Sequence, residues 1–557
     1  MRKSRFHGII LSIFSLAGTI CQAETTFWSD VPAEKLSGIL AGGMTDAELA
    51  GQVLLLGYMG AEPSPEILEW IGAYGIGGVK IFGWNAESLP DLTAAVSAMQ
   101  RESQGTRLRI PLLVATDQEG GWVRHVKGET SITPGNLALG AAEIPEDSYR
   151  TGYYIGMELH RLGINMNFAP TVDVYISADA DVIGPRAFSS DPRKTAELAV
   201  AYYRGMREAG IICTAKHFPG HGRANEDSHG TLPLINATID ELWDTDLLPY
   251  RFLIREGLPA IMSGHIGFPR IIDAETPASL SPYFETEILR NRMGFTGIVV
   301  TDDLQMNGVR VNGFGITTIA RKALEAGNDM IMVSRNPEQY LRIRNELLSA
   351  CARTPGFRDA LRKSVERILR IKLEYLKGPD AVPLYPQSRG IAASIKQEGS
   401  NDFFFQTACR SITLLGGADI PVKNPGRVLL AGQFRIFLQE GQRVFPGADE
   451  FLFSYTPFEE TDPSVIDSLK RMAGSYDTIV FCLANPNGLG VLRGLYEFRD
   501  RIIVFSVLTP VYLRELPWVR SAIAAYGTGR DSFRAGFSVL AGEYVPEGTL
   551  PISFTGR

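Results

Sequence analysis

Eight short apolar runs, each followed by a segment long enough for a helix, are the feature that most constrains the fold of this chain. The runs are rich in Val and Ile and fall between about residue 50 and residue 335. Short apolar strands that alternate with helical segments are typical of parallel βα units, and eight such strands close a (β/α)8 barrel. The predicted strands are Gln52–Tyr58, Gly78–Phe82, Pro111–Thr116, Asn165–Pro170, Ile211–Ala215, Ala260–Ser263, Ile298–Thr301 and Met330–Val333.

Local helix signals agree with this alternation. Thr45 and Glu48 have the spacing of a capping box that opens a helix before the first strand. Ile319 to Ala326 has the pattern of a late barrel helix that ends at Gly327, and glycine is common just past a helix end. We therefore assign residues 30–378 to an α/β domain with the architecture of a TIM-like barrel.

A second domain follows the barrel. Residues 379–400 are rich in Pro, Ser and Gly and lack periodicity, which indicates a linker. Because 557 residues exceed one ordinary core, two domains are expected. Residues 401–557 again alternate strands and helices, and we assign them to a smaller open α/β sandwich domain. Its predicted elements include the strands Val428–Ala431, Thr478–Leu483 and Ile502–Val507 and the helix Pro463–Gly474.

The first residues have the pattern of a processing signal. Basic residues among the first five precede a short apolar stretch, Ile9 to Ile20, and cleavage after Ala23 fits the small residues there. Residues 1–23 are thus predicted to be a signal peptide, and the protein is expected to be exported to the periplasm or the medium. The alternative is a lipoprotein acylated at Cys21, which the bulky Ile20 disfavours. No stable membrane insertion is expected without that lipid.

Composition excludes some classes of function. The net charge of −7 argues against a nucleic-acid partner, which would require a basic surface. The four cysteines after the leader have no CxxC spacing, so we expect buried single thiols rather than a zinc or redox site; they are Cys213, Cys351, Cys409 and Cys482. Nothing in the sequence indicates the oligomeric state.

Charged and histidine residues gather directly after several predicted strands. Because a parallel barrel places its active site at the carboxyl ends of the strands, these residues are candidates for chemistry. A charge beside a buried strand is costly unless it lies in a cleft. The segments concerned are Thr116 to Gly121, Lys216 to Gly222 with Asp227-Ser228-His229, Ser263 to His265, and Thr301 to Asp303.

Several of these residues have structural or different chemical interpretations. Asp302 could cap the next helix, although Asp303 can take that role. His217 and His221 are four residues apart, as in a helical metal site, but Pro219 and the neighbouring glycines exclude that helix and suggest a tight loop. Adjacent residues such as Asp227-Ser228-His229 cannot fold back into a serine triad.

The motifs together resemble glycoside hydrolase family 3, specifically its bacterial β-N-acetylglucosaminidases. The most specific block is Lys216 to Gly222 followed, after four residues, by Asp227-Ser228-His229. Further matching segments occur in the same order; they are Asp117 to Gly121, Asn167 to Pro170 with Asp173, Val182 to Gly184 with Arg186 and Phe188, and Thr301 to Leu304 with Met306.

The resemblance implies a retaining β-N-acetylhexosaminidase that releases terminal β-linked N-acetylglucosamine from cell-wall or chitin-type oligosaccharides. It implies that Asp302 is the nucleophile, that His229 is the general acid/base, and that Asp227 orients His229. A histidine with a carboxylate partner can move a proton near neutral pH. The implied sugar-binding residues are Asp117, Arg186, Lys216, His217, Arg124 and Met306. No metal or organic cofactor is implied.

This sequence departs from the family pattern at three places on the barrel mouth. The family carries an arginine where this chain has His125, and the nearest arginine is Arg124, so either residue could contact sugar. The loop between Asp173 and Val182 lacks the usual Asn and Pro, and residues 223–226 are also atypical. These departures concern specificity. Three alternatives therefore stay open: a β-glucosidase of the family, a phosphorylase that uses phosphate as acceptor, and an inactive sugar-binding protein.

Overall fold

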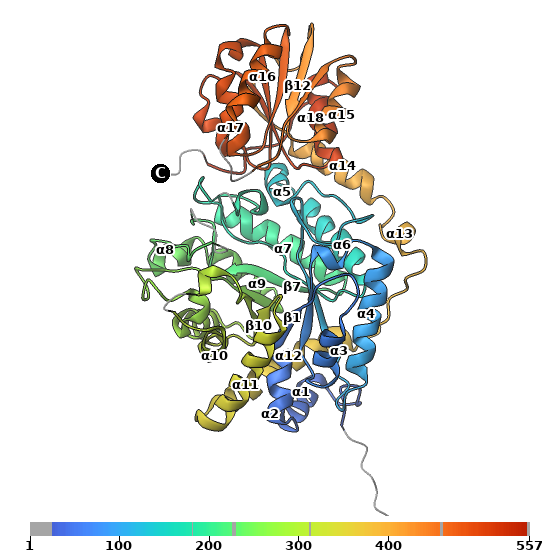
Figure 1. Ribbon diagram of the computed structural model, residues 1–557, viewed down its shortest axis with the longest axis vertical. Helices are drawn as coiled ribbons and strands as arrows, with labels where there is room; N and C mark the ends of the chain where they lie inside the picture. The colour runs from blue at the N-terminus through green and yellow to red at the C-terminus, as the bar shows by residue number, and fades with distance from the viewer. Residues whose placement is uncertain (1–24, 181, 225–229, 311–312, 457–460, 554–557) are drawn as a thin grey trace, which may run out of the picture.

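The computed structural model describes residues 25–180, 182–224, 230–310, 313–456 and 461–553. Its first domain is a closed barrel of eight parallel strands in the order β1-β10-β9-β8-β7-β6-β3-β2, which confirms the predicted barrel (Figure 1). The strands are β1 (Leu54–Gly57), β2 (Gly78–Ile81), β3 (Leu113–Thr116), β6 (Met166–Asn167), β7 (Ile212–Phe218), β8 (Ala260–Ser263), β9 (Ile298–Asp303) and β10 (Met330–Val333).

Two strands differ from the ranges that the sequence predicts. Strand β6 pairs over two residues only, and the predicted strand ran on to Pro170, which has no N–H to donate to a neighbour. Strand β7 instead extends through Lys216 and His217 to Phe218, where a tight loop was predicted. The charged residues are tolerated in this buried strand because acidic partners face them, as described below.

Helices surround the barrel strands. The capping box of Thr45 and Glu48 is present at the start of α2, and α10 ends at Gly327, which has a φ of 124°, as predicted. The helices are α1 (Ala33–Gly42), α2 (Asp46–Gln52), α3 (Pro65–Gly72), α4 (Leu89–Gln104), α5 (Asn136–Ala142), α6 (Pro145–Arg161), α7 (Pro192–Glu208), α8 (Ile239–Asp244), α9 (Leu248–Arg255), α10 (Ile316–Ala326), α11 (Pro337–Arg353) and α12 (Phe357–Leu376).

The C-terminal domain is a six-stranded sheet in the order β11-β16-β15-β14-β12-β13, in which only β11 is antiparallel to its neighbour. It confirms the predicted open α/β sheet. Its strands are β11 (Thr413–Gly417), β12 (Val428–Gly432), β13 (Asp449–Leu452), β14 (Thr478–Leu483), β15 (Ile502–Val507) and β16 (Ser521–Tyr526). Its helices are α14 (Ser400–Ser411), α15 (Arg435–Val444), α16 (Pro463–Ala473), α17 (Pro486–Gly494) and α18 (Arg530–Ala541).

The segment between the domains lies against the barrel. It contains one short helix, α13 (Ile391–Ser394). The hydroxyl of Thr93 in α4 donates to Ser388 Oγ over 2.8 Å, and Arg161 at the end of α6 donates to the Ile395 carbonyl over 2.7 Å. These bonds fix the path by which the chain leaves the barrel.

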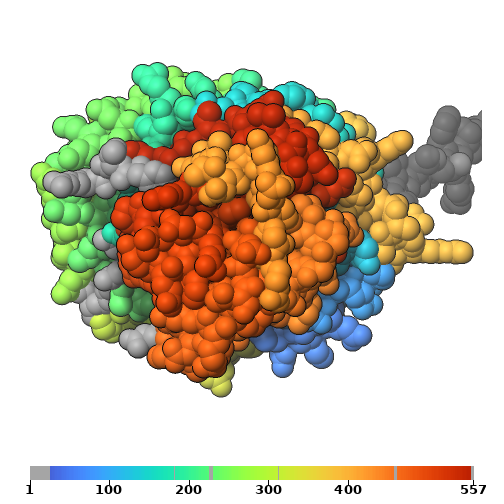
Figure 2. All heavy atoms as spheres, turned by 90° about the horizontal axis from the view of Figure 1, so that it is seen from above, coloured from blue at the N-terminus to red at the C-terminus, as the bar shows by residue number. Residues whose placement is uncertain are grey.

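The two domains share a buried apolar cluster. Leu137 of α5 and Ile183 of the barrel pack in one cluster with Leu483 and Tyr526 of the C-terminal sheet. Arg410 of α14 also donates two hydrogen bonds of 2.8 Å to Asp147 of α6. Seen from above, the C-terminal domain lies in front of the middle of the first domain (Figure 2). Burial of this apolar surface favours a fixed arrangement of the domains.

In the part of the chain that the structure describes, no helix is both long and apolar enough to cross a bilayer. The predicted leader, residues 1–23, lies outside the described residues. The four later cysteines are free thiols, and Cys213, Cys409 and Cys482 are buried, as expected, whereas Cys351 is partly exposed.

Candidate active site

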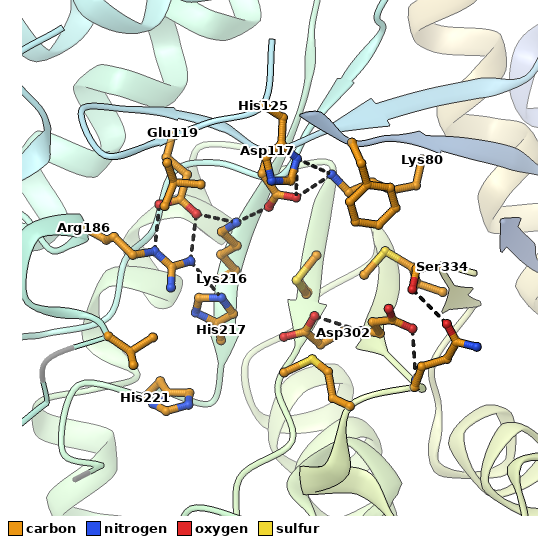
Figure 3. Close-up of a pocket in the computed structure, with 18 of the residues that line it drawn as sticks. Lys80, Asp117, Glu119, His125, Arg186, Lys216, His217, His221, Asp302 and Ser334 are labelled. Carbon is orange, nitrogen blue, oxygen red and sulfur yellow. Dashed lines mark hydrogen bonds and ion pairs between the residues drawn. The ribbon is translucent and has the colours of Figure 1, made fainter. Parts of the chain in front are cut away.

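A cavity of about 600 Å³ lies at the carboxyl ends of the barrel strands (Figure 3). Among the described residues, its lining comes from the barrel domain alone, between Lys80 and Arg335. The polar lining residues are Lys80, Asp117, Glu119, His125, Arg186, Lys216, His217, His221, Asp302, Asp303, Gln305, Ser334 and Arg335. The position is the one that parallel barrels use for their active sites.

Two buried ammonium groups hold Asp117, which follows β3 directly. Lys216 Nζ of β7 lies 2.5 Å from Asp117 Oδ1, and Lys80 Nζ of β2 lies 2.5 Å from Asp117 Oδ2. Burial alone would raise the pKa of Asp117, but Lys216 and Lys80 outweigh it and hold the pKa well below its usual value. Asp117 is therefore ionised, and both of its oxygens face fixed cations.

Glu119 joins this cluster to Arg186. It lies on β4 (Gln118–Gly120), which forms a hairpin with β5 (Val123–Arg124). Arg186 Nε and Nη2 donate to the two Glu119 oxygens over 2.9 and 2.8 Å, and Lys216 Nζ lies 2.6 Å from Oε1. Burial opposes ionisation of Glu119, but Arg186 and Lys216 lower its pKa to about 2. The bidentate pair fixes the plane of the guanidinium.

Asp173 and Arg186 each contact one ring nitrogen of His217. Its Nδ1 lies 2.7 Å from Asp173 Oδ2, and its Nε2 lies 3.2 Å from Arg186 Nη2. The backbone N–H of His221 also donates to Asp173 over 2.7 Å. Burial lowers the pKa of the His221 imidazole, which lines the cavity. Asp173 thus fixes two histidines of the β7 segment.

Asp302 and Asp303 end strand β9, and both line the cavity. Burial would raise the pKa of Asp302, but electrostatic attraction from His217 and His265 outweighs it and lowers the pKa. Burial raises the pKa of Asp303, whose Oδ1 accepts a hydrogen bond from the N–H of Gln305 over 3.0 Å. Of these adjacent carboxyl groups, Asp302 is therefore the one that its surroundings hold in the ionised form.

Asp302 also differs from Asp117, Glu119 and Asp173, the other acids whose contacts are described above. Within the described ranges it forms no ion pair with a Lys, Arg or His side chain, whereas Asp117, Glu119 and Asp173 each do. Its Oδ1 accepts the N–H of Asp303 over 2.8 Å. A carboxylate without a neutralising partner keeps its lone pairs available for reaction.

The structure brings six of the predicted site residues together and places one, Arg124, away from them. Asp117, Arg186, Lys216, His217, Asp302 and Met306 all line the cavity. The guanidinium of Arg124 instead donates to the Thr130 carbonyl over 2.9 Å, so Arg124 is turned away, and the neighbouring His125 lines the cavity. Asp227 and His229 lie outside the described residues, so their predicted roles stay predictions.

The sequence prediction gave no role to several residues of this network. Lys80 was assigned to an apolar strand, yet it is fully buried and pairs with Asp117. The sequence did carry one signal of this pairing, a single lysine inside a short apolar strand. A buried ammonium group needs an acidic partner, so this lysine indicated that one lies nearby. Glu119 and Asp173 stand in the recognised motifs, but their partners are distant in sequence.

Gly121, the second glycine after Glu119, is explained by the packing of the chain around it. Gly121 has a φ of 60°, and a Cβ there would lie 2.7 Å from the Gly135 Cα, which is an impossible contact. Gly121 is therefore required by close packing of the hairpin against another loop.

Across the described ranges, no group of three His, Cys, Asp or Glu side chains is arranged to hold a metal ion.

Comparisons with known proteins agree with this geometry. Residues 46–371 match the family model described as the glycosyl hydrolase family 3 N-terminal domain. β-Hexosaminidase A of Pseudoalteromonas piscicida is 32% identical over 488 residues, which cover 80% of this chain and 79% of that protein. A β-hexosaminidase of Methylococcus capsulatus is 38% identical over 312 residues, which cover 52% of this chain and 89% of that protein.

Solved structures of the same family also resemble this chain. The structure of a glycoside hydrolase family 3 β-N-acetylglucosaminidase from Paenibacillus sp. str. FPU-7 matches with a TM-score of 0.82 and 28% identity, covering 92% of this chain and 100% of that one. The family resemblance noted in the barrel motifs is thus confirmed, and the structural match extends it to both domains. The chain belongs to glycoside hydrolase family 3.

Proposed function

We propose that this protein is a retaining β-N-acetylhexosaminidase that hydrolyses terminal β-linked N-acetylglucosamine. The observation that carries the proposal is an ionised Asp302 that forms no ion pair in the described part of the chain, in the same cavity as Asp117 and Glu119, whose carboxylates are held by cations. The names of the relatives, β-hexosaminidase and β-N-acetylglucosaminidase, support the choice of sugar.

In the proposed reaction, Asp302 attacks the anomeric carbon and a covalent glycosyl-enzyme forms as the glycosidic bond breaks. His229 gives its proton to the departing oxygen. In the second step His229 takes a proton from water, the water oxygen attacks the same carbon, and the Asp302 carboxylate is released. Asp227 orients the His229 imidazole and stabilises its cation. Two displacements leave the sugar with its original β configuration.

The remaining cavity residues would hold the sugar hydroxyls. Lys216, Arg186 and His217 supply donors, and Asp117 supplies acceptor lone pairs beyond those used by the two lysines. Because these groups are fixed by one another, they need little reorganisation when a sugar binds. His125, rather than Arg124, stands where it can contact the ring, and Met306 offers an apolar surface.

The proposed substrates are cell-wall or chitin-type oligosaccharides with a terminal N-acetylglucosamine. The leader-like residues 1–23 support export to the periplasm or the medium, with a lipid anchor on Cys21 as the alternative. Export would bring the enzyme to polymeric or partly degraded glycans outside the cytoplasm.

An assay with aryl glycosides tests this proposal. We expect the aryl β-N-acetylglucosaminide to be cleaved well, the matching β-glucoside to be cleaved poorly, and phosphate to leave both rates unchanged. NMR should show the β anomer as the first product. Preferred cleavage of the glucoside, a phosphate-dependent sugar phosphate, or an initial α anomer would each contradict the proposal. A fluorinated N-acetylglucosamine analogue should label Asp302, as peptide mapping would show.

A further inference from the structure

A cation at the rim of the cavity has no acidic partner. Arg335 follows β10 and lines the cavity, and its side chain is exposed. Within the described ranges it takes part in no ion pair, whereas Lys80, Lys216 and Arg186 in the same cavity each pair with Asp117 or Glu119. Among the described residues that line the cavity, Arg335 is therefore the one Lys or Arg residue without an ion pair.

Aromatic rings hold Arg335 in place. Its guanidinium lies 4.9 Å from the ring centre of Trp84, and Trp84 stacks on Phe82 with ring centres 4.4 Å apart and planes 10° from parallel. Trp84 Nε1 donates to the Tyr58 carbonyl over 2.9 Å, which fixes the indole. A guanidinium that stacks on a fixed ring keeps its orientation and leaves its five N–H donors at the edge available.

The place of Arg335 indicates which part of a substrate it meets. The groups that would hold the terminal sugar are deep, since the side chain of Lys216 is 2% exposed and its partner Glu119 is 1% exposed. Ser334, the neighbour of Arg335, lies across Asp302 from the Arg186–Glu119 pair (Figure 3). In a cavity that closes around a terminal sugar, the group that leaves projects toward the open rim.

We propose that Arg335 binds a carboxylate on the leaving-group side of the substrate, so that the preferred substrates are anionic N-acetylglucosaminides. This inference rests on the proposed function and names the substrate class for the same site. A guanidinium and a carboxylate form paired N–H···O bonds, which neutral sugar hydroxyls cannot match. A bound carboxylate would supply the counter-charge that the cavity lacks at its rim.

Two aryl β-N-acetylglucosaminides test the proposal, one with a free carboxylate in the para position of the aryl group and one with its methyl ester. The measured quantity is the ratio of kcat/KM for the acid to kcat/KM for the ester. Differences in leaving-group reactivity cancel when this ratio is compared between enzymes. We expect R335Q to lower the ratio about tenfold, as for loss of a charged hydrogen bond, and R335K to lower it less.

The matched control is R389Q, which removes an exposed arginine charge from the segment between the domains. It should leave the ratio at the wild-type value. A ratio unchanged in R335Q, or one lowered equally in R389Q, would overturn the proposal. If the ratio is unchanged because R335Q loses activity equally on acid and ester, Arg335 instead supports Trp84. If the wild-type enzyme cleaves neither glycoside, the proposed function fails instead.

Discussion

Replacing Glu119 by Gln tests whether the charge network of the cavity contributes to stability. The substitution keeps the shape of the side chain and removes the charge that faces Arg186 and Lys216. At about 1.4 kcal/mol for each tenfold change, the lowering of the Glu119 pKa from 4.5 to about 2 corresponds to about 3 kcal/mol of unfolding free energy. Loss of one partner from a buried ion pair costs about 3 to 5 kcal/mol, which agrees.

The pH dependence has a defined sign. Because the folded pKa of Glu119 is lowered, its stabilisation is complete above pH 4.5 and is lost as the pH falls through about 2. Urea titrations of wild-type protein and E119Q should therefore differ by about 3 kcal/mol at pH 7 and by roughly half of that at pH 3. The exposed Glu197→Gln in α7 is the matched control and should change stability by less than about 0.5 kcal/mol.

The same substitution should lower kcat/KM, because Arg186 loses the bidentate contact that fixes its plane. A stability for E119Q within about 0.5 kcal/mol of wild type at pH 7 would refute the reasoning. That result would mean that water, rather than Glu119, solvates the two cations.

Three further predictions concern other residues. Asp302→Ala should lower kcat by orders of magnitude with folding intact by circular dichroism, whereas Asp303→Ala should keep more activity; the reverse result would move the nucleophile by one residue. His229→Ala should be impaired more for poor than for good leaving groups, and azide should restore part of its rate; equal losses without rescue would remove His229 from acid/base catalysis. Lys372 is buried with its Nζ 3.1 Å from Gln52 Oε1, and burial lowers its pKa to about 7. The folded state therefore loses stability as the pH falls from 10.5 to 7, so Lys372→Met should raise the Tm at pH 7 and not at pH 10.5; equal Tm values at pH 7 would contradict this.

The barrel could be predicted from the sequence because a parallel strand buried on both faces is a short apolar run. The ranges of β8 and β10 are those predicted, and neither contains a charge. Strand β7 was cut short at Ala215 because Lys216 and His217 break the apolar run. Only the positions of Asp117 and Asp173, about 100 and 44 residues earlier, show why these polar residues can continue a buried strand.

The sequence identified six residues that line the cavity and did not give the ion pairs among them. Position in a motif identifies Asp117, Arg186 and Lys216, but ion pairs between distant residues depend on the closed barrel. Arg124 and His125 show the limit of such reasoning, because adjacent residues in an extended segment point to opposite sides. Arg124 pairs opposite Gln118 in the hairpin and turns toward Thr130, which leaves His125 for the cavity.

The ion pairs also support the choice of Asp302 as the proposed nucleophile, which the residue types alone leave open. Among the described residues, five carboxyl groups line or support this cavity, and a count of charges alone cannot rank them. Asp117, Glu119 and Asp173 face cations or imidazole at 2.5 to 2.9 Å, so attack on a sugar by any of them would break a buried pair. Burial favours the neutral form of Asp303. Asp302 alone combines an ionised state with no ion pair in the described part of the chain, so it is the carboxylate whose attack disrupts least of the surrounding structure.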